Sequence, residues 1–574
     1  MDTKRITPGQ RFWRLLKPDA KEVRNIYIYS IFSGLISLSL PLGIQAIVNL
    51  IQGGQMNSSW IVLVVFVVLG IIITGVLQIY QLRITENLQQ KIFTRAAFEF
   101  SYRIPQIKME ALYKHYAPEL MNRFFDIVSV QKGLAKILID FSAAFFIVIF
   151  SLVLLSFYHP FFILFSVILV LLVYVIFKFT AQRGMSTCLE ESHYKYRVAH
   201  WLEELSRTAI TFKLAGKSDF PLEKTDRRVG SYLEAREDHF KVLVQQYSFL
   251  IVFKVLVATG LLAIGGVLVM NQQMNIGQFI AAEIIILLVM ASVEKLVLSV
   301  ESIYDILTAL EKIGQVTDLE LDRENGIDID ISPDDLGIEV EMKNVTFSFP
   351  DENKKTLNDV SLNLRKGEVA VIVGGSGSGK STLLHIISGL YDVQEGVISY
   401  NQLPIGNISL NSMREQIGDH MTMERLFEGT ILDNIALGRE MATFENVKWA
   451  VESLGLSDFI KGTSEGYNTV LDTQGKGLPE STVTKLLLAR SIAAKPKLLL
   501  LENPLEHLNE GECRKIIDFL TSKENKWSIV IVSPNIYLAK KASKIVVLKA
   551  GGVDAIGTYD ELKDSTNFNP NGNA

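Results

Sequence analysis

The sequence contains very little cysteine. Cys188 and Cys513 are the only two in 574 residues, and they lie far apart in the chain. This pattern indicates neither a disulfide framework nor a zinc site. The net charge of −5 is mild, and the absence of a basic stripe with interleaved aromatics argues against a nucleic-acid partner. The chain is also too long for one core, so at least two domains are expected.

The first 24 residues also lack a signal-peptide pattern. No small-residue cleavage site follows the first apolar run, so we expect no removable signal peptide. This stretch combines basic side chains with Phe12, Trp13, Leu15 and Leu16, which predicts a helix along the cytoplasmic membrane surface. Its basic residues are Lys4, Arg5, Arg11, Arg14, Lys17, Lys21 and Arg24.

What the first half does contain is long apolar runs. A helix needs roughly 20 apolar residues to span the hydrocarbon core of a bilayer. The alternative, a large soluble protein with buried helices, is disfavoured by the loops. Loops 52–59 and 271–275 contain no Lys or Arg, whereas segments 81–140 and 181–248 are rich in both. This positive-inside pattern places both termini in the cytoplasm. Six spans are predicted, at residues 25–50, 60–80, 141–158, 160–179, 249–270 and 276–300.

We interpret the two basic segments, 81–140 and 181–248, as helical extensions of the spans. We expect breaks around 112–120 and 201–214 that are suited to docking on another domain. Pro118 marks the clearest break, because proline disfavours helical geometry in the residue before it.

Two charged residues inside the spans are informative because charge is costly there. Lys254 and Glu294 fall at similar depth. We predict that they pair or face a common wet cavity. The alternative is that Lys254 and Lys295 extend to the cytoplasmic surface.

From Ile338 onward, short β-like runs alternate with helical ones, as in a doubly wound α/β sheet. An apolar strand at 369–373 and a helix at 383–390 flank a full phosphate-binding loop. Its glycines let backbone N–H groups surround phosphates, Lys380 supplies a positive charge, and Ser381 offers a hydroxyl to Mg²⁺. A chance glycine-rich turn would rarely supply all these features. The loop consists of Gly374, Gly375, Ser376, Gly377, Ser378, Gly379, Lys380, Ser381 and Thr382.

Six spans followed by this loop resemble the ABC exporter family, half-transporter type, over essentially the whole chain. Segments 344–350, 426–435 and 487–501 also carry the resemblance. It implies an α-helical six-span membrane domain plus an α/β P-loop nucleotide-binding domain. It further implies a homodimer or heterodimer that sandwiches two ATP molecules, with Mg²⁺, between phosphate loops and signature segments. Phe349 matches the aromatic residue that stacks on adenine, usually Tyr in the family.

Several family motifs are altered. Thr422 stands where the family has a Gln that senses Mg²⁺. The Leu-Ser-Gly-Gly-Gln signature is replaced by residues 478–482, Leu-Pro-Glu-Ser-Thr. Pro479 lacks an N–H donor, and Glu480 places a negative charge where γ-phosphate would approach. We favour the simpler interpretation that this segment is only a good helix start, with Pro near N1 and Glu in the first turn.

The predicted catalytic positions are altered as well. Glu502 keeps a carboxylate, which with Ser381 makes the predicted metal site. Asn503 occupies the general-base position, and a neutral amide cannot accept that proton. Pro534 replaces the His that contacts γ-phosphate, and Asn509 replaces the Asp that links the two sites. No catalytic residue is therefore assigned, and ATPase activity of this chain is expected to be weak or absent.

The leading hypothesis is an ATP-binding ABC exporter subunit with impaired hydrolysis, in contact with membrane lipid and a second half-transporter. The alternatives are an active exporter that uses Glu502 as its base, and a non-transporting ATP-binding scaffold. The sequence does not indicate which substrate is transported. Its composition suits a protein of a bacterial inner membrane. The predicted organisation is a surface helix (1–24), transmembrane domain (25–312), linker (313–337), nucleotide-binding domain (338–563) and disordered tail (564–574).

Overall fold

The computed structural model describes residues 6–53, 58–329, 331–332, 334–422 and 424–563, so the predicted tail lies outside the described residues. The chain forms two compact units. The helical unit comprises Met1–Pro105 and His115–Leu319. The α/β unit comprises Gln106–Lys114 and Glu320–Ala574. The short segment 106–114 is thus separated in sequence from the rest of the α/β unit.

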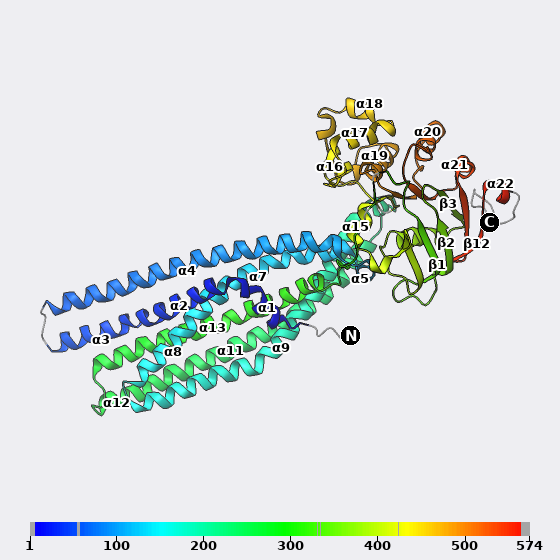
Figure 1. Ribbon diagram of the computed structural model, residues 1–574. Helices are drawn as coiled ribbons and strands as arrows, with labels where there is room; N and C mark the ends of the chain where they lie inside the picture. The colour runs from blue at the N-terminus through cyan, green and yellow to red at the C-terminus, as the bar shows by residue number, and fades with distance from the viewer. Residues whose placement is uncertain (1–5, 54–57, 330, 333, 423, 564–574) are drawn as a thin grey trace. The chain divides into compact units, whose positions relative to one another are not determined.

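Within the described residues, the helical unit has six helical stretches long and apolar enough to cross a membrane. The prediction of six spans is therefore confirmed. Figure 1 shows these helices running side by side. The elements are α1 (Pro8–Leu16), α2 (Ala20–Ser37), α3 (Ser39–Gln52), α4 (Ser59–Arg103), α6 (Ala117–Met121), α7 (Asp126–Ala135), α8 (Ser142–Ser156), α9 (Pro160–Arg207), α10 (Ala209–Leu214), α11 (Phe220–Gly260), α12 (Gly266–Met270) and α13 (Ile276–Thr317), with π-helical turns at Lys136–Phe141 and Leu261–Gly265.

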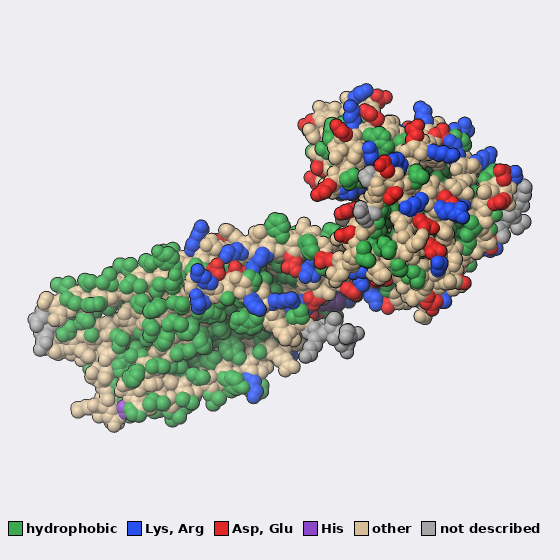
Figure 2. Space-filling model, viewed as in Figure 1, with side chains coloured by type: hydrophobic (Ala, Val, Ile, Leu, Met, Phe, Trp, Pro, Cys, Tyr) green, Lys and Arg blue, Asp and Glu red, His purple; other side chains and the backbone are tan. Residues whose placement is uncertain are grey.

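The outer faces of these helices carry large apolar side chains that the unit itself does not cover. Phe66 on α4 is 67% exposed, and Val167 on α9 is 61% exposed. Figure 2 shows hydrophobic side chains over much of the visible surface of this unit, with Lys and Arg concentrated over one part of its length. A water-soluble protein rarely exposes so large an apolar surface. Lipid is the solvent that suits it, so the helical unit spans a membrane.

Inside the span region, α11 and α13 are joined by an ion pair. Lys254 Nζ lies 2.8 Å from a carboxylate oxygen of Glu294. The predicted pairing is confirmed, and Lys254 does not simply extend to the surface. An unpaired charge is costly in a low-dielectric medium. Each residue therefore depends on the other, and the pair links these two helices.

The α/β unit is built on two main sheets. The six-stranded sheet has the order β12-β11-β3-β10-β9-β6, and only β12 runs antiparallel to its neighbour. The second sheet, β2-β1-β4-β5, is antiparallel. The strands are β1 (Val340–Phe347), β2 (Leu357–Leu364), β3 (Val369–Gly374), β4 (Glu395–Tyr400), β5 (Leu403–Pro404), β6 (Ile417–His420), β7 (Gly429–Thr430), β8 (Val470–Leu471), β9 (Leu498–Glu502), β10 (Ser528–Val532), β11 (Lys544–Lys549) and β12 (Gly552–Gly557).

Helices complete the α/β unit. The central strands β9 and β10 are buried along their whole length, as expected for parallel strands covered on both faces. The predicted combination of a helical membrane domain and an α/β domain is confirmed. The helices of this unit are α5 (Met109–Tyr113), α14 (Lys380–Ile387), α15 (Leu410–Glu415), α16 (Ile431–Ala436), α17 (Phe444–Ser453), α18 (Ser457–Gly462), α19 (Glu480–Ala493), α20 (Glu510–Leu520), α21 (Ile536–Lys541) and α22 (Tyr559–Leu562).

The helical extensions are broken near the predicted places. The first break separates α5, which ends at Tyr113, from α6, which begins at Ala117, with Tyr116 extended between them. Pro118 lies in the first turn of α6, where its missing N–H has no intrahelical partner to lose. The second break falls at Thr208, between α9 and α10, and buried Trp201 remains within α9.

The Lys254–Glu294 pair gives the first prediction. Lys254→Met and Glu294→Gln should each lower the melting temperature of the purified protein, because each leaves one charge without its partner. The charge swap Lys254→Glu with Glu294→Lys should recover much of the loss. The melting temperatures can be read from fluorescence-detected size-exclusion chromatography. The single reversals Lys254→Glu and Glu294→Lys are measured as well. If the swap loses as much melting temperature as these two reversals lose together, the pair does not couple the two helices.

Candidate functional site

The predicted phosphate-binding loop leaves β3 and enters α14 through backbone conformations that need glycine. Gly377 and Gly379 have φ values of 74° and 98°, in the region that glycine adopts without steric cost. A Cβ at Gly379 would also lie 2.7 Å from Leu357 Cδ2 and 3.0 Å from the carbonyl of Thr356. The tight curl of the loop thus depends on this residue type.

The loop presents an open side and a closed side. Its exposed side bears the backbone of residues 375–377, together with the Ser381 side chain, while its other side is held in the core. An open concave backbone at a helix N-terminus is suited to binding an anion. Among the predicted residues, Gly375, Ser376, Gly377 and Ser381 are exposed, Gly374 and Lys380 are half-buried, and Ser378, Gly379 and Thr382 are buried.

Lys380 folds back across the loop. Its Nζ donates to the carbonyl of Gly374 at 2.9 Å and to that of Gly375 at 2.7 Å. Burial lowers the pKa of the Lys380 ammonium, although nearby Glu502 acts in the opposite direction. The charge is therefore placed at the mouth of the loop, with donors that can exchange these carbonyls for phosphate oxygens.

The sheet brings Glu502 to the same edge as the loop. β3, β10 and β9 are parallel, with Ile372 paired to Val532 and Val532 paired to Glu502. The carboxyl ends of these strands consequently meet. The Ser381 hydroxyl donates to Glu502 Oε1, so the two predicted metal ligands are in direct contact.

A second donor holds the other oxygen of Glu502. The backbone N–H of Thr422 donates to Oε2 at 3.0 Å. Burial acts to raise the pKa of Glu502, but the hydrogen bonds from Ser381 and Thr422 outweigh it, so the pKa is lowered. Both carboxylate oxygens are therefore engaged in the ionised form. Thr422 lowers the pKa of Glu502 through its side chain as well as through its backbone N–H.

The residues at the predicted catalytic positions serve the local backbone. Asn503 is in the left-handed region, with a φ of 47°, and its N–H donates to the carbonyl of Val532 at 2.9 Å. The Asn509 side chain caps α20 by accepting from the N–H of Glu512 at 2.9 Å. Pro534 follows β10, and the next residue, Asn535, caps α21 through its side chain. Asparagine suits both left-handed and capping positions.

Segment 478–482 leads into α19, as the simpler interpretation predicted. Pro479 is the N-cap residue, next to N1, and Glu480 lies in the first turn. The carbonyl of Pro479 accepts from the N–H groups of Thr482 and Val483. Glu480 is stabilised there by the positive end of the helix dipole.

Comparison with known proteins identifies the family of this chain. Residues 23–293 match the ABC transporter transmembrane region, and residues 357–506 match the ABC transporter nucleotide-binding family. The chain belongs to the ABC transporter family. It is an exporter-type half-transporter, because one membrane region and one ABC region share the chain, and it is an integral multi-pass membrane protein.

Individual relatives agree with this assignment. YgaD of Bacillus subtilis, whose name describes a multidrug export ATP-binding/permease protein, is 24% identical over 569 residues, or 97% of each chain. The alpha-hemolysin translocation protein HlyB of Escherichia coli O157:H7 is 29% identical over 304 residues, covering 52% of this chain and 43% of HlyB. A bacterial Atm1-family ABC exporter solved with ATP bound has the same fold, with a TM-score of 0.84 at 18% identity over 95% of this chain and 97% of that one.

Phe349, which is predicted to stack on adenine, contacts an aromatic ring that the sequence did not predict. The ring of Tyr113 stacks on that of Phe349, with centroids 5.1 Å apart and planes at 13°. Phe347 and Tyr391 meet Phe349 edge-on at 5.1 Å and 5.4 Å. Phe349 is thus fixed by three rings, with one of its two faces covered by Tyr113.

Polar contacts hold the segment 106–114 in this place. The Tyr113 hydroxyl donates to Glu352 at 2.7 Å, and Lys114 pairs with Asp351 at 2.6 Å. Glu110 accepts from the N–H of Asp392, also at 2.7 Å. The predicted docking stretch began at Leu112, so it included Tyr113 but extended into the helical unit. No sequence pattern pointed to Phe349 as the target, because the two rings are far apart in the chain.

Another carboxylate, half-buried Glu424, lies beside the Thr422 turn. Burial, followed by the proximity of Asp419, raises its pKa to about 9. The backbone N–H of Met421 donates to it at 2.7 Å, and Arg490 lies 3.8 Å away. Glu424 therefore holds a proton in the folded protein at pH values where the unfolded chain has released it.

This raised pKa gives a pH-dependent prediction. From about pH 4.5 to about pH 9 the unfolded state loses the Glu424 proton while the folded state keeps it, so stability falls as pH rises. Glu424→Gln imitates the protonated form. It should raise the melting temperature at pH 8 relative to wild type, with little difference near pH 5. Asp419→Asn is the companion variant, because it removes the neighbouring charge. A constant difference across this range would contradict the assigned protonation.

Proposed function

We propose that this half-transporter is an ATP-binding exporter subunit whose own hydrolytic chemistry is impaired. The observation that carries the proposal is the engagement of Glu502. Its two oxygens accept from Ser381 and from the Thr422 backbone, and its pKa is lowered. A carboxylate held in this way is a poor proton acceptor, and the next residue, Asn503, is a neutral amide.

The ATP-binding part of the proposal rests on the loop and on Phe349. The exposed loop backbone and Lys380 would hold the phosphates, and the free face of the Phe349 ring would hold adenine by stacking. Ser381 and Glu502 offer hard oxygen ligands in contact with each other, which fits Mg²⁺. The metal would neutralise phosphate charge. The protein itself supplies the orientation of these two oxygens.

The geometry does not favour the two alternative functions. An active exporter with Glu502 as its base would need that carboxylate to release its two donors. A non-transporting scaffold would be favoured by a charge-free membrane region, whereas the Lys254–Glu294 pair places two charges between spans α11 and α13. The proposed localisation is a bacterial inner membrane, as the bacterial relatives suggest.

Exporters of this type function as dimers, and the proposed partner is a second half-transporter. A homodimer would have Asn503 and the 478–482 segment in both composite sites. A heterodimer with an intact partner would divide these alterations between its two sites. ATP binding would then close the dimer, and any turnover would depend mainly on the partner. The transported substrate is not assigned.

The rate of ATP hydrolysis by wild type, by a single variant and by a combined variant tests the proposal. The purified chain should show ATPase activity close to that of its Lys380→Ala variant. Asn503→Glu restores a general base, which is typically worth about 10²–10⁴ in rate. Its effect should be small until Pro479→Ser, Glu480→Gly, Ser481→Gly and Thr482→Gln also restore backbone donors. The combined variant should be at least about 100-fold faster than wild type.

Adding Lys380→Ala to the combined variant should abolish the gain and serves as its control. Binding is measured separately with a fluorescent ATP analogue. Wild type should bind the analogue, and Lys380→Ala should bind it more weakly. Robust wild-type turnover that Lys380→Ala removes would show that the proposed impairment is wrong.

The Tyr113 ring supplies another prediction. Tyr113→Ala should weaken binding of the fluorescent ATP analogue by about threefold to tenfold, because an aromatic pair is worth about 0.5–1.5 kcal/mol and Phe349 would lose its fixed position. Tyr113→Phe keeps the ring and loses only the hydrogen bond to Glu352, so it should bind nearly as well as wild type. Tighter binding by Tyr113→Ala would instead mean that Tyr113 blocks the adenine face.

A further inference from the structure

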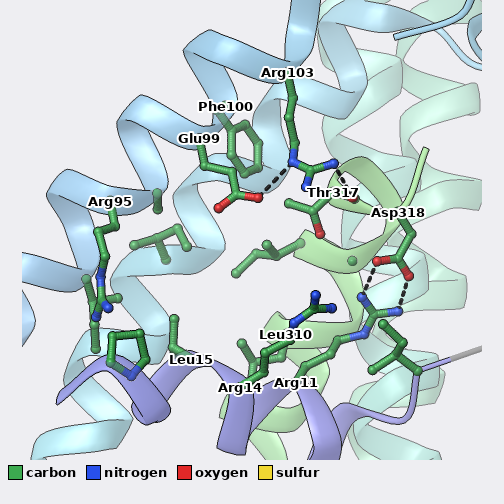
Figure 3. A pocket seen from close by; sticks show the side chains of 17 residues that line it. Arg11, Arg14, Leu15, Arg95, Glu99, Phe100, Arg103, Leu310, Thr317 and Asp318 are labelled. Atoms are coloured by element: carbon green, nitrogen blue, oxygen red, sulfur yellow. Dashed lines mark hydrogen bonds and ion pairs between the residues drawn. The ribbon is translucent and has the colours of Figure 1, made fainter. Parts of the chain in front are cut away.

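Arg11 fixes the helix α1 to the helical unit, and two further arginines nearby, on α4, are also paired. A pocket of about 360 Å³ lies between α1, α4 and α13 (Figure 3). In it, Arg11 donates to both oxygens of Asp318, one at 2.8 Å, and Arg103 donates to Glu99 at 2.7 Å. Arg95 pairs with Asp19. These three arginines are therefore neutralised by acidic neighbours.

A second hollow, of about 710 Å³, lies in the angle between α1 and α2. Its volume falls in the range of ordinary ligand sites. Val23, Tyr27 and Ile31 contribute to it from positions four residues apart on α2, and so form one stripe of that helix. Trp13 on α1 completes the apolar lining and is 65% exposed. We call this hollow the elbow groove.

Three cations also line the elbow groove. Arg14, Lys17 and Arg24 are exposed, and within the described chain none of them forms an ion pair with an acidic side chain. The nearby carboxylates are already used, because Asp19 pairs with Lys91 and Arg95, and Glu22 pairs with Lys91 at 2.8 Å. Arg14 also borders the pocket of Figure 3. The groove thus combines an apolar stripe with uncompensated positive charge.

We propose that the elbow groove binds an anionic phospholipid of the cytoplasmic leaflet. Arg14, Lys17 and Arg24 bind the phosphate of its headgroup, and an acyl chain lies along the α2 stripe. The charge pattern selects this occupant. A juxtamembrane cluster of Lys and Arg attracts anionic lipid, and an apolar stripe beside it binds the chain of the same molecule. A zwitterionic lipid would satisfy the stripe but not the surplus charge.

The placement of α1 gives the site a rigid wall. Arg11 ties α1 to Asp318, immediately after α13, and buried Leu16 packs its other end. The three cations are consequently presented from a fixed helix and from the first turns of a span. A bound headgroup would link α1 to α2 through charge, in addition to the link that Arg11 makes from α1 to Asp318 and the link that Asp19 makes from the start of α2 to Arg95 on α4.

Native mass spectrometry of the full-length chain in detergent tests the proposal. The probes are palmitoyl-oleoyl phosphatidylglycerol and phosphatidylcholine, which share acyl chains and differ in charge. The charge variant combines Arg14→Gln, Lys17→Gln and Arg24→Gln. Its matched control combines Lys213→Gln, Lys217→Gln and Arg227→Gln, which remove the same charge from exposed positions elsewhere in the helical unit. Ile31→Trp fills the groove and leaves the charges unchanged.

Wild type should retain phosphatidylglycerol at least about tenfold more tightly than phosphatidylcholine. The charge variant should lose this preference, the matched control should keep it, and Ile31→Trp should weaken retention of both lipids. Retention of the fluorescent ATP analogue and an unchanged elution volume verify folding. Arg14→Lys with Arg24→Lys supplies a charge-preserving variant that should still prefer the anionic lipid if the charge variant fails to fold.

Three results would overturn the proposal. Equal loss in the charge variant and its matched control would assign the preference to general surface charge. Displacement of phosphatidylglycerol by glycerol 3-phosphate alone would mean a free-phosphate site without a role for the acyl chain. A lipid-free dimer in which Ile31→Trp disrupts the association would mean that a second copy of the chain covers the groove.

Discussion

The nucleotide site depends on the parallel register of three strands. With β3, β10 and β9 side by side, the pairing of Ile372, Val532 and Glu502 puts the end of the phosphate loop strand and the end of the acidic strand at one edge. Ser381 then reaches Glu502 directly. An antiparallel arrangement would send one of these groups to the opposite edge. The site geometry is thus a consequence of topology before any side chain is considered.

The residues at the predicted catalytic positions support the fold through their local backbone. Asn509 and Asn535 cap helices, Pro479 precedes α19 as its N-cap residue, and Asn503 adopts a left-handed backbone that asparagine tolerates. Each residue meets a backbone requirement at its own position. A catalytic base or a γ-phosphate contact is not among these requirements, so the local fold does not depend on that chemistry.

The sequence predicted features that depend on local pattern or on strong physical cost. Apolar length predicted the six spans, the spacing of glycines with Lys380 predicted the loop, and the cost of intramembrane charge predicted the Lys254–Glu294 pair. Tyr113 could not be predicted in the same way. Its partner Phe349 is distant in sequence, and the contact depends on segment 106–114 joining the α/β unit. The break before α6 was predicted from Pro118, which lies in the first turn of that helix.

Charge compensation distinguishes the structural ion pairs of the helical unit from the cations of the elbow groove. Lys254 has Glu294 and Arg11 has Asp318, so each of these groups is satisfied within the protein. Such groups hold elements in place. The cations of the elbow groove differ, because their acidic neighbours are already paired with Lys91 and Arg95. Uncompensated charge beside an apolar stripe is stabilised by an external anion with an apolar chain, and the membrane supplies that combination where α1 meets α2.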